Sequence, residues 1–299
     1  MARLVIITHE FDAFAYRDQA AGEWTSPYML WDILKHLAGM GHQCRITAGA
    51  NAHEGEVALL HVDASLVSED YLALASNFEA TINFAAKDIT KKRISTLRLS
   101  LEEHDDWTGP VIVKSNLNSE GKPEAAHNRI AQRRNRPLPH PGIKRTPYRI
   151  LDSKDDVESA VWYDPSLIVE RFITEPDISG GFAFRTWVFM GSQERCTRFV
   201  GPKPIGKAGD AVKHEPVEVP TELRSERERL GFDFGKFDWI MHDGRAVLID
   251  ANRTPGTARS IEGFMSAGSR NLAEGLDGLI RERLSKCPKA GPLRSLARQ

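Results

Sequence analysis

Two stretches late in the chain carry its clearest structural signal: Phe237-Asp238-Trp239-Ile240-Met241 and Val247-Leu248-Ile249-Asp250-Ala251-Asn252. Both are rich in β-branched and aromatic residues, and Asp243-Gly244-Arg245 lies between them, which predicts a β-hairpin. The side chains of a strand alternate between its two faces. One face of the hairpin is therefore expected to be wholly apolar and to consist of Phe237, Trp239, Met241, Val247, Ile249 and Ala251.

The length of the hairpin turn determines whether the polar side chains of the other face meet. A two-residue turn at Asp243-Gly244 would place Asp238 and Asp250 on opposite faces. A three-residue turn that includes Arg245, or an equivalent bulge, pairs Asp238 with Asp250 and keeps the opposite face apolar. We therefore predict the three-residue turn and a cluster of Asp238, Asp250 and Asn252. Such oxygen donors suit Mg²⁺ that also binds phosphates, and the alternative is an exposed acidic edge without a ligand.

The rest of the chain predicts an α/β protein. Residues 1–85 alternate short apolar runs with amphipathic segments, which is typical of an open α/β lobe. The expected strands cover 4–7, 44–47, 57–62, 81–84, 110–114, 167–173, 182–190 and 195–200. The expected helices cover the region from Ser26-Pro27 to Ala38, and residues 69–77, 152–160 and 270–284.

Composition excludes several classes of function. The chain has 299 residues, and its 40 Lys and Arg residues balance 41 Asp and Glu residues, so no general attraction to nucleic acid or membranes is expected. No apolar stretch approaches the length of a membrane span, and the N-terminus lacks the features of a signal peptide. Its 3 cysteines are far apart, which fits a reducing cytoplasm.

Residues 122–149 differ from the rest of the chain because they are rich in proline and arginine. We expect a solvated insertion without a packed core there. RNA binding through this segment is the alternative, and it is disfavoured because Tyr148 is the only Phe, Tyr or Trp residue in it.

The hairpin and the residues around it, from Gly235 to Gly256, resemble the metal-binding end of ATP-grasp enzymes. In that superfamily an Asp, then an acidic residue and an Asn two positions apart, followed closely by Pro-Gly, coordinate Mg²⁺ on the nucleotide triphosphate. Asp238, Asp250 and Asn252 match this pattern, although the middle ligand is usually Glu. The resemblance implies ATP and Mg²⁺ as cofactors, with Mn²⁺ as a substitute.

The same resemblance, which covers roughly residues 80–270, implies further nucleotide contacts. In ATP-grasp enzymes a lysine at the end of a strand contacts the nucleotide phosphates, and a loop of small residues closes over them. Main-chain groups of another strand bind the adenine base, and an acidic residue binds the ribose. The matching residues are Lys114 with Lys91 (or its neighbour Lys92), Ser119 and Gly121 in the loop, Glu170 and Ile173 at the base, and Asp177 at the ribose. The loop departs from the pattern because it contains a single glycine, and the segment between Lys91 and Lys114 is short.

The implied organisation is an α+β ATP-grasp region behind an open α/β lobe. The expected parts are a lobe at 1–85, a central subdomain at 86–170 with the basic insertion, a C-terminal subdomain at 171–285 and a flexible tail at 286–299. ATP-grasp enzymes mostly activate a carboxylate as an acylphosphate for attack by an amine or another nucleophile, so such small molecules are the expected partners. The implied catalytic residues are Lys236, Arg185 and Arg253.

Two alternatives to a ligase stay open on the sequence. One keeps the fold and makes a hydroxyl or phosphate the acceptor of the phosphoryl group, which is a kinase. The other is a non-catalytic nucleotide-binding module, which the short 91–114 segment favours. A homodimer is the default expectation for the assembly because dimers are the commonest oligomers.

Overall fold

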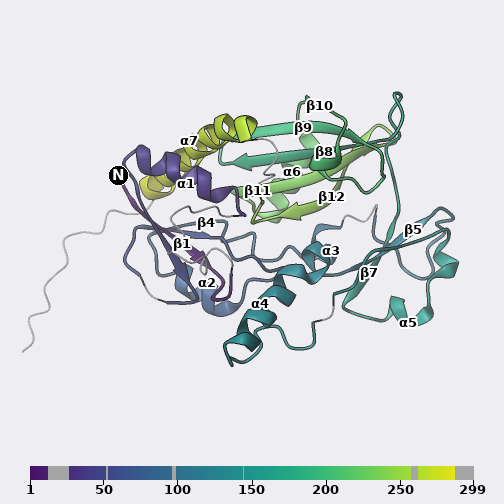
Figure 1. Ribbon diagram of the computed structural model, residues 1–299, viewed down its shortest axis with the longest axis horizontal. Coiled ribbons are helices and arrows are strands. Elements are labelled where there is room, and N and C mark those ends of the chain that lie inside the picture. The colour runs from purple at the N-terminus through teal and green to yellow at the C-terminus, as the bar shows by residue number, and fades with distance from the viewer. Residues whose placement is uncertain (13–26, 52, 96–98, 144, 257–261, 287–299) are drawn as a thin grey trace, which may run out of the picture.

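The fold consists of three β-sheets with helices packed on and between them, as the computed structural model shows (Figure 1). It describes residues 1–12, 27–51, 53–95, 99–143, 145–256 and 262–286. Ser26 and the predicted tail from residue 287 onward lie outside these described residues. In Figure 1 the sheet that contains β1 lies on the left, the sheet that contains β8 and β11 lies at the top, and β5 and β7 lie on the right.

The N-terminal sheet is parallel and has the strand order β2-β1-β3-β4. Its strands are β1 (Arg3–Thr8), β2 (Gln43–Ala48), β3 (Val57–Leu60) and β4 (Ala80–Ile82), and its helices are α1 (Leu30–Gly39) and α2 (Glu69–Ala75). Leu4 and Ile6 join the core with α1, whereas Val5 and Ile7 join the core with α2. Both faces of β1 are therefore buried, which explains why its sequence is one continuous apolar run. The predicted open α/β lobe is confirmed.

The five-stranded sheet is antiparallel, with the order β10-β9-β8-β11-β12. Its strands are β8 (Phe182–Met190), β9 (Gln193–Gly201), β10 (Lys213–Pro216), β11 (Phe234–His242) and β12 (Arg245–Asn252). Helix α6 (Thr221–Leu230) precedes β11, and α7 (Glu262–Lys286) follows the sheet. Leu272, Leu276 and Ile280 of α7 share one core with Leu4 of β1 and Met190 of β8, so α7 ties this sheet to the N-terminal lobe.

The predicted three-residue turn between β11 and β12 is wrong. The turn has two residues, Asp243 and Gly244, with φ of 49° and 71°, which are the positive values that a tight hairpin turn of this kind requires. A bulge at Ile249 then shifts the register, so that Asp238 pairs with Asp250 as predicted.

The bulge also corrects the predicted apolar face of the hairpin. Leu248, not Val247 or Ile249, packs with Trp239 in the core beneath the sheet. Val247 and Ile249 pack on the other side, with Ile240. A one-residue shift exchanges the faces of a strand, and the bulge confines that exchange to the residues between it and the turn.

The third sheet is antiparallel, with the order β6-β5-β7. Its strands are β5 (Val111–Ser115), β6 (Arg149–Leu151) and β7 (Leu167–Arg171). Helix α5 (Ser159–Trp162) packs on β7, α3 (Lys91–Ile94) lies against β12, and α4 (Lys122–Arg133) follows the short 3₁₀ turn Asn118–Gly121. Two further 3₁₀ turns cover Lys154–Asp156 and Ala208–Asp210. The helix predicted over 152–160 is thus a 3₁₀ turn, capped by Ser153, that is followed by α5.

The expectation that residues 122–149 lack a packed core is wrong for the first part of the segment. Helix α4 buries Glu124, His127 and Ala131 along one side. The prolines that suggested an irregular insertion are concentrated in 137–147, beyond the end of α4. Across the described residues, no helix combines the length and the hydropathy needed to span a bilayer.

Candidate functional site

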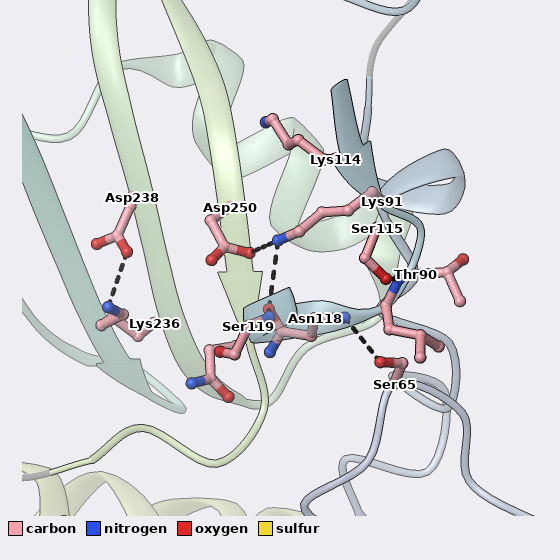
Figure 2. Close-up of polar contacts among 12 residues, drawn as sticks. Ser65, Thr90, Lys91, Lys114, Ser115, Asn118, Ser119, Lys236, Asp238 and Asp250 are labelled. Carbon is pink, nitrogen blue, oxygen red and sulfur yellow. Dashed lines mark hydrogen bonds and ion pairs between the residues drawn. The ribbon is translucent and has the colours of Figure 1, made fainter. Parts of the chain in front are cut away.

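The two carboxylates of the hairpin lie side by side on β11 and β12, and each is held by a lysine (Figure 2). One Asp238 oxygen accepts a hydrogen bond of 2.8 Å from the Thr186 hydroxyl, and the other forms an ion pair of 2.7 Å with Lys236. Asp250 forms its ion pair with Lys91. The site therefore alternates negative and positive side chains at the edge of the sheet.

Both lysines are held in place by the fold. Lys91 is only 2% exposed, its ammonium also lies 3.3 Å from the Asn118 amide oxygen, and its main-chain N–H donates to the Asn116 carbonyl at 2.8 Å. Burial lowers the pKa of Lys236, but the carboxylates of Asp238 and Asp250 outweigh burial and raise it overall. Lys236 is therefore a cation at neutral pH.

Asn252 is the third predicted metal ligand, and its side-chain oxygen faces the loop that follows β12. It accepts hydrogen bonds from the Thr254 N–H at 2.8 Å and from the Thr254 hydroxyl at 3.2 Å. The hydroxyl of Thr254 also bonds to Asp63 at 2.7 Å, which connects the hairpin to the N-terminal lobe. The role of Asn252 as a ligand stays a prediction.

The predicted phosphate loop has an unusual backbone. Ser119, Glu120 and Gly121 have φ of 48°, 61° and 74°, so three successive residues adopt left-handed conformations that only glycine adopts easily. Helix α4 begins directly after them, and its N-cap residue, Gly121, provides no side-chain cap. The Lys122 N–H donates to the Ser119 carbonyl and Pro123 has no N–H, so the N–H groups of the first turn that can face a ligand begin at Glu124. Asn118 fixes the start of the loop, because its N–H donates to the Ser65 hydroxyl at 2.8 Å (Figure 2). Uncapped N–H groups at a helix start are suited to phosphate oxygens.

Lys114, at the end of β5, is buried and forms an ion pair with the buried Glu170 of β7. Glu170 pairs with Ile112 of β5 in the sheet, so its main chain is engaged there and its side chain is what reaches the site. The base contact predicted at Ile173 lies beyond the end of β7 and stays a prediction.

Breaking this buried pair is expected to destabilise the protein. In Lys114→Met the Glu170 carboxylate is left buried without its cation, and the free energy of unfolding should fall by roughly 3–5 kcal/mol. The double variant Lys114→Met/Glu170→Met should recover most of that loss, because both charges are removed, yet it should not recover nucleotide binding. Chemical denaturation and ATP titration of the single and double variants measure the two effects. Equal stability of both would contradict a coupled pair.

Arg185 and Asp177, which were predicted to contact ligands, are engaged within the protein. Arg185 forms a two-pronged ion pair with Glu175, with one N–O distance of 2.7 Å, and lies 4.9 Å over the Trp239 ring. Asp177 accepts hydrogen bonds from the N–H and hydroxyl of Ser179 and pairs with Arg198. The ligand roles of both residues stay predictions that would require these partners to exchange.

The acidic groups of this network predict a loss of stability at low pH. Burial raises the pKa of Glu175, but Arg185 and the Met241 N–H outweigh burial and hold it below the ordinary value of 4.5. A carboxylate with a lowered pKa stabilises the fold above its unfolded pKa, and that contribution is lost as the pH falls. Denaturation midpoints measured from neutral pH to below 4.5 should therefore fall more steeply for the native protein than for Glu175→Gln. Parallel curves would contradict this contribution.

Arg253, predicted to contact the substrate, is fully buried instead. Its guanidinium donates to the carbonyls of Val62, Ala64 and Ala86, with distances of 3.0 Å to Val62 and 2.5 Å to Ala64. These carbonyls lie in the loops that follow β3 and β4. The structure therefore places Arg253 as a residue that positions the loops around the site.

Some residues of the site were missed on the sequence. Thr186 and Asn118 bond to the predicted residues Asp238 and Lys91, and Ser65 bonds to Asn118, but each is a common polar residue without a motif around it. Tyr148 is a further residue of this region: burial and then the nearby charges of Asp250, Glu120 and Glu170 raise its pKa. Its isolated place in the basic segment gave no sign of this position.

Comparison with solved structures defines the class of fold. The chain aligns with D-alanine–D-alanine ligase from Bacillus anthracis at a TM-score of 0.53 and 15% identity, over 95% of this chain and 99% of that one. It aligns with a RimK domain ATP-grasp protein from Sphaerobacter thermophilus at 0.52 and 15% identity, over 93% and 100%. The ATP-grasp ligase PsnB, solved with a precursor peptide and AMPPNP, aligns at 0.51 and 12% identity, over 93% and 98%. The chain therefore has the ATP-grasp fold.

The likeness is one of structure and not of sequence. No protein-family model and no curated protein sequence matches this chain.

Proposed function

We propose that this chain is an ATP- and Mg²⁺-dependent ligase that activates a carboxylate as an acylphosphate for attack by an amine or another nucleophile. One observation carries the proposal: the hairpin holds two carboxylates, each paired with a lysine, beside the left-handed loop that leads into helix α4. The structural neighbours that are named as ligases support the class of reaction. The structure of D-alanine–D-alanine ligase with ATP and that of PsnB with Mg and ADP support both cofactors.

The residues present fit magnesium and a nucleotide. Carboxylate oxygens are the donors that Mg²⁺ prefers, and lysines and main-chain N–H groups are the usual donors to phosphate. Asp238 and Asp250, with Asn252, would hold the metal, while Lys91 and Lys236 would turn from the carboxylates to the phosphates. When bound, Mg²⁺ would neutralise charge on the transferring phosphoryl group.

The other proposed roles belong to cations and to the backbone. Lys91, Lys114 and Lys236 would stabilise negative charge that spreads over the phosphate oxygens. Gly121 would bring its main-chain N–H to the same oxygens, whereas the Ser119 N–H, which donates to the Asn118 side-chain oxygen at 2.9 Å, would first have to exchange that partner. This chemistry requires no covalent nucleophile from the protein, only two substrates in position.

A screen of carboxylic acids crossed with amines, in Mg²⁺ and ATP, tests the proposal through phosphate release. A ligase should release phosphate only when both substrates are present. Hydroxylamine in place of the amine should trap the activated acid as a hydroxamate. Formation of ADP without free phosphate, with the phosphoryl group retained on a product, would indicate a kinase instead. ATP binding without turnover for any pair would favour a binding module.

A further inference from the structure

Three histidines from separate parts of the chain meet between the N-terminal lobe and α4. His9 follows β1, His127 lies on α4 and His140 lies in the loop after α4. One ring nitrogen of each lies within 4.8 Å of the others. The rings of His9 and His127 stack at 3.8 Å, and His127 Nδ1 lies 3.3 Å from His140 Nε2.

Hydrogen bonds hold two of these histidines in place. The Asn128 side chain donates to the His140 carbonyl at 2.7 Å and accepts from the His140 N–H at 3.0 Å. The Phe11 N–H donates to His9 Nδ1 at 3.1 Å. Burial, with a smaller effect of His140, lowers the pKa of His9 to about 3. The ring is therefore neutral at physiological pH, which is the form that binds metals.

Glu124 adds a buried carboxylate beside the histidines. It lies three residues before His127, on the same side of α4, and both are buried. One of its oxygens accepts from the Ser65 N–H at 2.7 Å, and in the described part of the chain the other has no hydrogen-bond partner. A buried carboxylate is costly without a cation or a donor. Glu124 interacts with the charge of the buried Arg253, whose guanidinium is bonded to main-chain carbonyls, so the second oxygen of Glu124 is left to balance a cation at the histidines.

We propose that His9, His127 and His140 bind a divalent transition metal of the zinc class. Imidazole nitrogens suit zinc, and two of them on a tetrahedral Zn²⁺ would lie about 3.3 Å apart, given Zn–N bonds of about 2.0–2.1 Å. The nitrogens of His127 and His140 already lie 3.3 Å apart. Coordination by either ring nitrogen of His9 gives up the hydrogen bond from Phe11, because Nδ1 then carries either the metal or the ring proton. That is a small loss against a metal–imidazole bond. The negative charge of the Glu124 carboxylate would partly balance the positive charge of the metal.

A metal at this position would act on the arrangement of the nucleotide site. It would join the end of β1 to α4, and α4 begins directly after Ser119-Glu120-Gly121. The phosphate loop would thus be fixed against the N-terminal lobe. This site is separate from the magnesium site proposed on the hairpin, and its donors are nitrogens instead of oxygens.

Titration of the full chain with Zn²⁺ and Co²⁺, after chelator treatment and in excess Mg²⁺, tests the site. We expect one equivalent of each metal to bind, visible Co²⁺ absorption bands of tetrahedral intensity, and a higher melting temperature with Zn²⁺. His127→Gln and His140→Gln should each weaken binding by at least about tenfold, whereas the exposed His104→Gln should bind like the native protein.

Two further results decide where the metal sits. Asp250→Asn should retain the Zn²⁺ site, since its carboxylate belongs to the hairpin. Circular dichroism checks that each variant folds, and His9→Gln replaces any variant that does not. Equal Zn²⁺ affinity of the native and histidine variants, binding that disappears in Asp250→Asn, or no binding by the native chain would each overturn the proposal.

Discussion

Asp250→Asn should reduce substrate-stimulated phosphate release by at least about 100-fold, an effect at the upper end of those seen when metal sites are disturbed. Asp250 is proposed to hold the metal, and it also pairs with Lys91, which is proposed to contact the phosphates. The amide keeps the size of the side chain but loses its charge, so both the metal and the lysine lose their partner. Phosphate release from ATP, with an acid and an amine that stimulate the native protein, measures the loss.

The matched control is Asp243→Asn, on the turn of the same hairpin. The Asp243 side chain is 89% exposed, and the asparagine side chain tolerates its positive φ. Because Asp250→Asn leaves the buried Lys91 without its carboxylate, melting temperatures must show that the variant is folded at the assay temperature. A folded Asp250→Asn protein with native turnover would refute the metal assignment on the hairpin.

The hairpin shows how far the sequence predicts such a site. The pairing of Asp238 with Asp250 could be inferred because it is the register that brings Asp238, Asp250 and Asn252 together on one face and leaves the opposite face apolar. The way in which the pairing is reached could not be inferred. Leu248 and Ile249 are both apolar and both fit a core, so their pattern does not reveal the bulge that separates them.

The lysines of the site were predicted, but their partners were not. Lys91, Lys114 and Lys236 stand at recognisable places in their strands and motifs. Glu170 and Asn118 become their partners only after distant segments come together, and no spacing in the sequence encodes that contact.

The prediction for the basic segment 122–149 was wrong for a related reason. Its arginines are spread over both halves, and the prolines of its second half give the whole segment an irregular composition, which hides the helix of the first half. His127 and His140 lie in that segment, far in sequence from His9, and the three have no metal-ligand spacing. Only the packing of α4 against the end of β1 brings them together.

Arg253→Met should lower the free energy of unfolding by roughly 3–5 kcal/mol, the range for buried charged groups that lose their partners. The methionine side chain fills much of the space but leaves the carbonyls of Val62, Ala64 and Ala86 without a donor. Each unsatisfied buried group costs about 1–3 kcal/mol. Denaturant unfolding followed by tryptophan fluorescence measures the change.

The exposed Arg245→Met, at the start of β12, should stay within about 0.5 kcal/mol of the native protein and shows what the loss of a surface arginine costs. Arg253→Lys separates the two roles of Arg253. One ammonium keeps the charge but cannot reproduce the planar fork that serves three carbonyls, so it should recover only part of the stability. If Arg253→Met were as stable as Arg245→Met but lost turnover, Arg253 would instead contact the substrate, as the sequence suggested. A large loss of stability in Arg253→Met, partly restored by lysine, would establish that Arg253 acts through the loops after β3 and β4.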